Sequence, residues 1–100
     1  MQAIDGVRGS LDDLQAILER VADSGDDWAR ELVPRAMGRL ERAWSNGSIQ
    51  PTAGLAVRLS DELHRRVARI DAIRDRQSAM REATAALGAL AALRVLLRSA

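Results

Sequence analysis

The first half of the chain carries apolar residues at intervals of three and four, which is the spacing of one face of an α-helix. The first such run consists of Leu11, Leu14, Ile17, Leu18 and Val21. It begins after Ser10, a residue type that caps helix N-termini, and it ends before Gly25, a common stop signal. The pattern predicts a helix over residues 11–23, preceded by a loosely ordered arm over residues 1–9.

A second run places an apolar residue at every fourth position between residues 28 and 44. Its members are Trp28, Leu32, Ala36, Leu40 and Trp44. The spacing predicts a helix over residues 28–44, capped by Asp26 or Asp27, with both tryptophans in the core; a role as interface hot spots is the alternative for them. Pro34 lies within the run, so the helix either kinks there or begins anew at the proline.

Residues 45–51, SNGSIQP, predict a loop, because Asn-Gly and proline both interrupt helices. No proline follows, and residues 52–98 predict a long helix. Unbroken, that helix would be about 70 Å long, about twice the width of a compact domain of this size. We therefore expect it to break near residues 76–78, where polar residues gather, or to leave the domain and meet a second copy. The predicted fold is a small all-α bundle in one domain, residues 1–100.

The most hydrophobic segment is ATAALGALAALRVLL, residues 83–97, in which thirteen of fifteen residues are apolar or glycine. A helix that is apolar on all sides must be covered by other protein or by lipid. A 100-residue chain has little with which to cover it, so the segment predicts a homodimer. The residues predicted to form its interface are Ala85, Leu87, Ala89, Leu90, Ala92, Leu93, Leu96 and Leu97.

The net charge is only +1, but it is unevenly distributed. Residues 1–50 hold six arginines and nine acids, whereas residues 51–100 hold nine arginines and five acids. Arg58, Arg65, Arg69 and Arg76 are spaced by seven, four and seven, which predicts one basic helix face. We interpret it as a salt-bridged solvent face, with pairs Asp61–Arg65 and Glu62–Arg66, or as an electrostatic docking face for an acidic protein.

Residues that carry catalytic or metal chemistry are scarce. The chain has no Cys, Lys or Tyr and a single histidine, His64, three residues after Asp61. Carboxylate metal bundles need a second histidine and further carboxylates, and hydrolytic triads need a nucleophile turn that is absent here. We therefore expect no enzymatic activity, no metal and no cofactor.

The N-terminus has no apolar core of a secretory signal, and the longest apolar run is too short to span a bilayer, which predicts a cytoplasmic protein. All fifteen basic residues are arginine, which is typical of a GC-rich genome and favours a bacterial or phage source.

The predicted function is a non-enzymatic protein–protein interaction module: a small regulatory, adaptor or antagonist protein that binds itself and an unidentified protein partner. The alternative is a helix-turn-helix DNA-binding regulator that uses the hairpin over residues 43–63 and the arginine face. A second alternative is an amphipathic membrane-surface protein, with Arg81, Arg94 and Arg98 flanking the apolar run. Neither nucleic acid nor membrane is the expected partner, because acids dilute the basic face and the apolar run is short.

Overall fold

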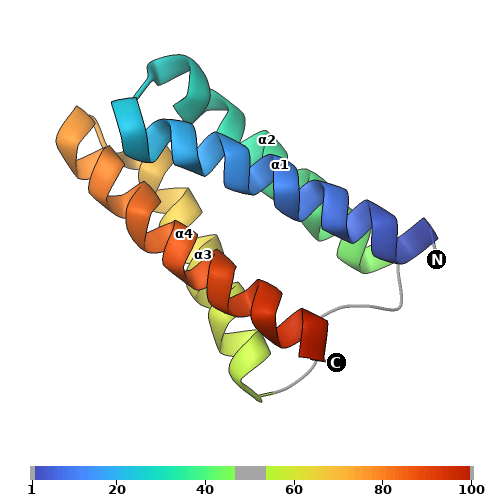
Figure 1. Cartoon of the computed structure of the whole chain (residues 1–100). Helices are drawn as coiled ribbons and strands as arrows, with labels where there is room; N and C mark the ends of the chain where they lie inside the picture. Colours follow the sequence, from blue (N-terminus) through green and yellow to red (C-terminus); the bar gives the residue numbers. More distant parts are fainter. Residues whose placement is uncertain (1, 47–53, 100) are drawn as a thin grey trace.

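The computed structural model describes residues 2–46 and 54–99 and shows the predicted small all-α bundle. Its helices are α1 (Gln2–Ser24), α2 (Asp27–Asn46), α3 (Gly54–Ala72) and α4 (Arg76–Ser99). Successive helices run in opposite directions, so that α1 begins and α4 ends at the same end of the molecule (Figure 1). The turns over residues 25–26 and 73–75 lie at the other end, which we call the closed end.

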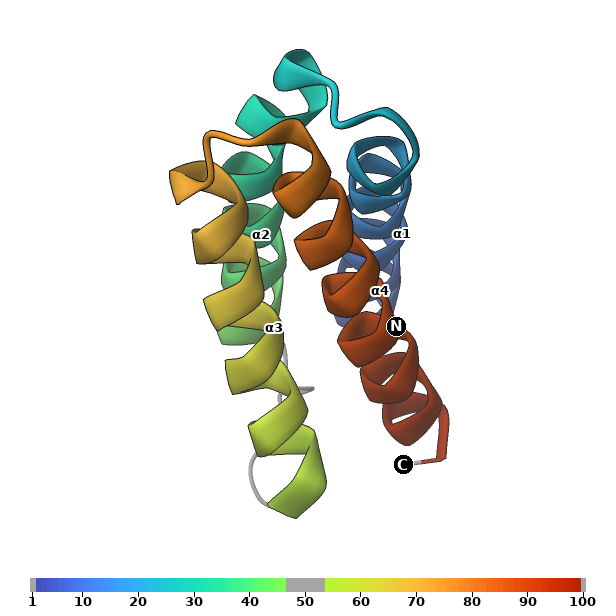
Figure 2. The same cartoon turned by 90° about the vertical axis from the view of Figure 1, so that its left-hand side faces the viewer.

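Each helix packs against two neighbours. Helix α1 contacts α2 and α4, and α3 contacts α4 and α2; within the described residues no contact joins α1 to α3 or α2 to α4. Figure 2 shows α4 in front, with α3 on one side of it and α1 on the other. The contact between α2 and α3 is the least extensive of the four. The bundle is therefore two hairpins, α1–α2 and α3–α4, joined mainly through α1 and α4.

All four helices contribute to one hydrophobic core. Its largest fully buried side chains are Leu14, Leu18, Val21, Val33, Leu40, Leu63, Ile70, Leu90 and Leu93. Helix α4 adds four buried alanines, Ala79, Ala83, Ala86 and Ala89. The large buried side chains of α4, Leu90 and Leu93, lie in its second half. In its first half the small alanine side chains allow the neighbouring helices to pack closely against it.

The first helix is longer than predicted. It begins at Gln2, so the prediction of an arm over residues 1–9 is wrong, and Ser10 lies inside the helix rather than at its cap. Val7, one helical turn before Leu11, is buried with 3% exposure. Burial of that side chain offsets the helix-weakening effect of the nearby Gly9, which costs about 1 kcal/mol relative to alanine.

The long C-terminal helix breaks, as one of the two predicted alternatives required. The break covers residues 73–75, just before the predicted position, and the molecule is 38 Å in its longest dimension. Asp75 caps α4 by accepting hydrogen bonds from the hydroxyl of Ser78 (2.7 Å) and its backbone N–H (2.9 Å). These bonds, the hydroxyl bond first, lower the pKa of Asp75. The cap satisfies the N–H group of Ser78 in the first turn of α4, so a second helix can begin at Arg76 after the first ends at Ala72.

The turn between α1 and α2 follows the predicted signals. Gly25 adopts a φ of 65° after the end of α1, a conformation that glycine tolerates and other residues rarely adopt. A Cβ there would also collide with the side chain of Arg76, so α4 begins against this turn. Asp26 accepts a hydrogen bond of 3.0 Å from the N–H of Trp28, which confirms one of the two predicted caps.

Two predictions about α2 have different outcomes. The helix is continuous from Asp27 to Asn46 and includes Pro34, so it does not begin anew there. Trp28 is 59% exposed, so its predicted place in the core is wrong. Each four-residue step advances the helix by about 40° beyond a full turn, and two such steps from the buried Ala36 carry Trp28 off the inner face. The side chain of Trp44 and residues 47–51 of the predicted loop lie outside the described residues.

The arginine at the start of α2 joins that helix to the end of α3. The guanidinium of Arg30 donates to the backbone oxygens of Ile70 and Ile73 and is largely buried. Ile70 is one of the last residues of α3, whose carbonyls have no partner inside the helix, and Ile73 is the first residue after it. A cation at this position also stabilises the negative end of the helix dipole.

Candidate functional site

Helix α4 has an apolar face on each side. Its inner face packs into the core through the alanines named above and through Leu90 and Leu93. Its outward face consists of Thr84, Gly88, Ala91, Ala92 and Val95, all exposed. No charged residue occurs between positions 83 and 93. We call these five residues the α4 outward face and take it as the candidate functional site.

The structure separates the predicted interface residues into two groups. Ala89, Leu90 and Leu93 are buried in the core of the single chain, so they cannot reach a second molecule while the bundle keeps this packing. Of the others, Ala92 is exposed and Ala85, Leu87 and Leu96 are half-buried beside the outward face. The side chain of Leu97 lies outside the described residues. The contribution of all eight to association stays a prediction.

Sequence analysis missed four members of the outward face: Thr84, Gly88, Ala91 and Val95. When a segment is apolar on all sides, its periodicity does not indicate which side faces the core. The charged residues that border the segment indicate which side faces solvent. Arg81 is exposed, and Val95 lies fourteen residues later, about four turns along the helix, so the two residues share the outward side.

Side chains of the adjacent helices hold the charges of Glu82 and Arg94 away from the outward face. On the α1 side, Arg94 donates to Asp12 (2.6 Å) and Gln15 (2.9 Å). On the α3 side, Glu82 accepts from Arg66 at 3.1 Å. Between residues 82 and 94 the helix therefore exposes an uncharged strip to solvent.

Arg66 lies at the centre of this second contact. It also pairs with Glu62 at 3.0 Å, which confirms one of the two predicted helix pairs. The hydrogen bond to Glu62 raises the pKa of the Arg66 guanidinium, an effect that desolvation opposes and Glu82 reinforces. The other predicted pair, between the described residues Asp61 and Arg65, does not form.

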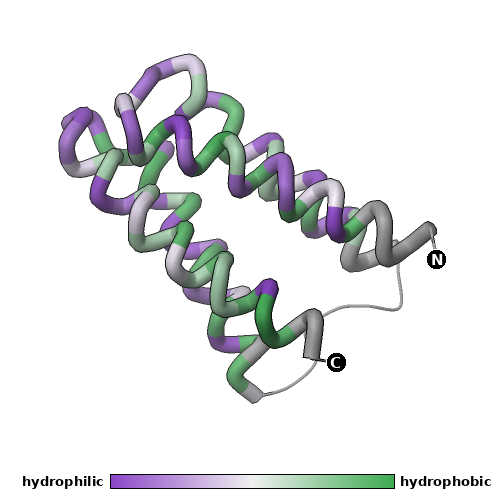
Figure 3. Tube along the Cα trace, viewed as in Figure 1, coloured by the Kyte–Doolittle hydropathy of each residue, from purple (hydrophilic) through white to green (hydrophobic). Residues whose placement is uncertain are grey.

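Large exposed hydrophobic side chains mark both ends of the molecule. At the closed end, the indole of Trp28 is covered by the guanidinium of Arg20, 5.2 Å from the ring centroid. At the opposite end, Val95 of α4 is 58% exposed and Leu55 of α3 is 59% exposed. In Figure 3 the second half of α4 is green or pale apart from one purple position, whereas α1 alternates between purple and green. Of the three large hydrophobic side chains exposed in the described part of the chain, two therefore lie on the α3–α4 hairpin.

The predicted arginine face does not form as one surface. Arg58, Arg65 and Arg69 are exposed on α3, but α3 ends at Ala72, so Arg76 lies beyond the break on α4. Within the described residues no carboxylate pairs with these four arginines.

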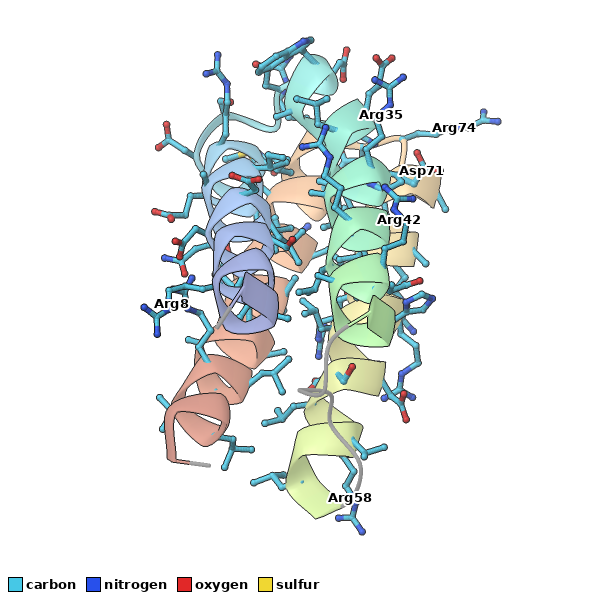
Figure 4. The ribbon with its side chains drawn as sticks, turned by 90° about the vertical axis from the view of Figure 1, so that its right-hand side faces the viewer. Arg8, Arg35, Arg42, Arg58, Asp71 and Arg74 are labelled. Atoms are coloured by element: carbon cyan, nitrogen blue, oxygen red, sulfur yellow. The ribbon has the colours of Figure 1, made fainter. Side chains whose placement is uncertain are left out.

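Other arginines are distributed around the molecule. Figure 4 shows Arg8 on α1, Arg35 and Arg42 on α2, Arg58 on α3 and Arg74 in the turn after α3, in different directions. This distribution does not produce the single basic surface that would follow a nucleic-acid backbone.

The single histidine belongs to the contact between α2 and α3. Nδ1 of His64 on α3 lies 2.8 Å from Oε1 of Glu41 on α2. Asp61 is on α3 itself, on the other side of this contact from Glu41. Among the described residues no three histidine or carboxylate side chains converge in a way that would hold a metal ion. The Asp61–His64 pair therefore gives the structure no ligand set.

Comparison of the chain with models of protein families, with curated proteins and with solved structures finds no match. In the described part of the chain, no helix has both the length and the apolar character required to cross a membrane.

Proposed function

We propose that this protein is a non-enzymatic protein-binding module that associates with itself through the α4 outward face. The observation that carries the proposal is that α4 buries one apolar face in its own core and exposes a second. A helix at the surface of a monomer normally has a polar outer face, as α1 does. Exposed contiguous apolar surface of this kind is typical of interaction sites.

The composition of the outward face supports a helix as its occupant. Gly88, Ala91 and Ala92 project little from the helix, so a second helix can approach closely, while Val95 supplies apolar area beside them. Close approach increases the number of van der Waals contacts across the interface. In this proposal the self-associated protein acts as a small regulator, adaptor or antagonist.

A charge placed on the outward face tests the proposal. We expect the unaltered protein to sediment as a dimer at micromolar concentration and the Ala91→Glu/Val95→Glu variant to sediment as a monomer with unchanged helical content. The matched control is Arg35→Gln/Arg39→Gln, which lowers the net charge by the same two units at exposed positions of α2, a helix that does not contact α4 in the described residues, and this variant should remain dimeric. A monomeric unaltered protein in sedimentation would contradict the proposal.

The two alternatives receive less support. The helices of a helix-turn-helix cross at about 90–120°, whereas α2 and α3 are neighbours in an antiparallel bundle (Figure 2). An apolar helix face also suits a membrane surface, but Arg94, one of the predicted flanking arginines, is held by Asp12. Sedimentation of the protein with anionic vesicles distinguishes this case, since we expect the protein to stay in the supernatant.

A further inference from the structure

We propose that the second copy binds with its α4 parallel to the first, related by a two-fold axis along the helix direction. This inference rests on the proposed function, and it adds the arrangement of the dimer and the groups that select it. The occupant of the α4 outward face is then α4 of the second copy. Its α1 and α3 lie on either side of the contact.

The area of the outward face shows that its neighbours must contribute. From Thr84 to Val95 the outward face covers twelve residues of α4, so it is about 18 Å long and about 10 Å wide. A stable interface buries about 800 Å² on each partner, roughly four times the area of this face. The two helices that border α4 must therefore supply the rest, and their charges become relevant.

These bordering helices have opposite charge. Helix α1 carries five acids and two arginines, and its exposed acids on or near the α4 side are Asp12, Glu19 and Asp23. Arg20 lies beside Glu19 and Asp23, and Asp12 is already paired with Arg94, so the edge is acidic by a smaller margin than the acids alone indicate. Helix α3 carries exposed Arg58, Arg65 and Arg69, for which the described residues provide no carboxylate partner. Arg65 and Arg69 share a surface depression with Glu62 and with Arg66, which contacts Glu82 of α4, and this places these two on the α4 side of α3. The apolar strip of α4 is thus bordered by an acidic edge and a basic edge.

The acidic and basic edges also lie beside the same residues along the axis of α4. The pair Arg66–Glu82 places the adjacent Arg65 near residue 82 of α4. On the other side, Glu19, Arg20 and Asp23 line a surface depression together with Leu87. Arg58 lies seven residues before Arg65, about 10 Å further along, toward the height of Asp12 and Arg94. Acids and arginines therefore occupy the same range of α4 on opposite sides.

Symmetry then determines which edges meet. A closed dimer that uses the same face on both copies has its two-fold axis in the interface plane. An axis along α4 brings α1 of one copy toward α3 of the other, so acids face arginines at equal height. An axis across α4 brings α1 toward α1 and α3 toward α3, so like charges face each other, which disfavours that arrangement. Arg81, at the start of the outward side, faces its own counterpart in the parallel dimer, which is one like-charge contact. The acids and arginines of the two edges provide more opposed pairs than this one contact removes, and charge complementarity therefore favours the parallel dimer.

Single cysteines test the arrangement directly, because the chain has none of its own. We would prepare Thr84→Cys, Ala91→Cys and Val95→Cys separately and oxidise each mildly. In a parallel dimer every outward position meets its own counterpart, so all three variants should form a disulfide-linked dimer. The control Ala16→Cys, exposed on α1, should not.

An antiparallel dimer gives a different pattern. Positions 84 and 95 are about 16 Å apart along the helix, whereas a disulfide requires Cα atoms about 4.4–6.8 Å apart. Only Ala91→Cys would then link to itself, while a mixture of Thr84→Cys and Val95→Cys would form mixed dimers. That result would overturn the parallel arrangement and leave the proposed function intact. Absence of any linkage, together with a monomer in sedimentation, would overturn both.

Charge reversal provides a second readout. Arg65→Glu and Asp23→Arg should each weaken dimerisation about two- to fivefold at low salt, the range of an exposed charge pair. In the double variant Arg65→Glu/Asp23→Arg, an acid on α3 of each copy faces an arginine on α1 of the other. Both symmetric contacts are again pairs of opposite charge, so the double variant should recover the original affinity. Arg35→Glu, on the outer side of α2, is the matched control and should have no effect. Failure of the double variant to recover would contradict the charge argument.

Discussion

Helices α1 and α4 each bury one inner face but differ in what they expose. Helix α1 packs through Val7, Leu11, Leu14, Leu18 and Val21 and exposes mainly charged residues. Helix α4 packs through alanines and two leucines and exposes Thr84, Gly88, three apolar positions and few charges. The inner faces define the fold of the single chain. The outer faces differ because, in our proposal, that of α4 forms the centre of the contact with a second copy.

The comparison changes how self-association should be tested. Substitution of Leu90 or Leu93, the centre of the predicted interface, removes core side chains and cannot separate unfolding from dissociation. Substitution of Ala91 or Val95 changes only the exposed face. Each variant below alters one face or one contact, so that the roles of α1 and α4 can be measured separately.

The largest expected effect comes from the inner face of α4. Leu90→Ala should lower the free energy of unfolding by about 3 kcal/mol, because Leu90 is fully buried and its truncation leaves a cavity. Val95→Ala, on the outward face, should cost less than about 1 kcal/mol in a monomeric background such as Ala91→Glu. Urea denaturation followed by circular dichroism measures both. Equal costs for the two variants would remove the distinction between the faces.

Two glycines provide the next contrast. Gly25→Ala should destabilise by about 1–2 kcal/mol, because its φ of 65° strains an alanine and its Cβ would meet Arg76. In the monomeric Ala91→Glu/Val95→Glu background, Gly88→Ala should stabilise by about 0.5–1 kcal/mol, because a Cβ there meets nothing within 4 Å and alanine favours helix. Thermal denaturation should shift the two midpoints in opposite directions. A loss of stability in Gly88→Ala would show that the outward face is not free in the monomer.

A smaller effect is expected where α1 and α4 are joined by charge. Arg94→Met should remove the contacts to Asp12 and Gln15 and lower stability by about 0.5 kcal/mol, since both acceptor and donor are partly accessible to solvent. The effect should decline as salt is added. Arg35→Met is the control, because Arg35 is exposed on α2 and makes no ion pair in the described part of the chain.

The smallest expected effect is a pH dependence at the start of α4. The pKa of Asp75 is lowered in the folded protein by its bonds to Ser78, so the folded state binds a proton there less readily than the unfolded state. This contribution is present above the unfolded pKa and is lost as pH falls through the lower, folded pKa. Asp75→Asn should therefore reduce the acid-induced decrease of the melting temperature. Identical pH profiles for both proteins would contradict the assignment.

The sequence predicted the elements better than the faces. Helical spacing, Gly25 and Asp26 correctly indicated the turn between the first two helices, because these signals act within a few residues. The position of Trp28 could not be obtained from spacing alone, since small rotations accumulate over several turns. The inner side of α4 depends on which residues of the other helices it meets, and the break before Arg76 was recognisable only as a polar segment. Contacts such as Arg30 with Ile73, distant in sequence, carry no local signal.

The even number of helices has a consequence for how this chain can be joined to others. Because α1 begins and α4 ends on one side, any polypeptide attached to either end leaves from that side, and the closed end with Trp28 stays unobstructed. In the parallel arrangement all four attachment points of a dimer would point the same way. A short linker could then connect two copies in tandem. Domains fused to the ends of the two copies would lie next to each other on the same side of the dimer.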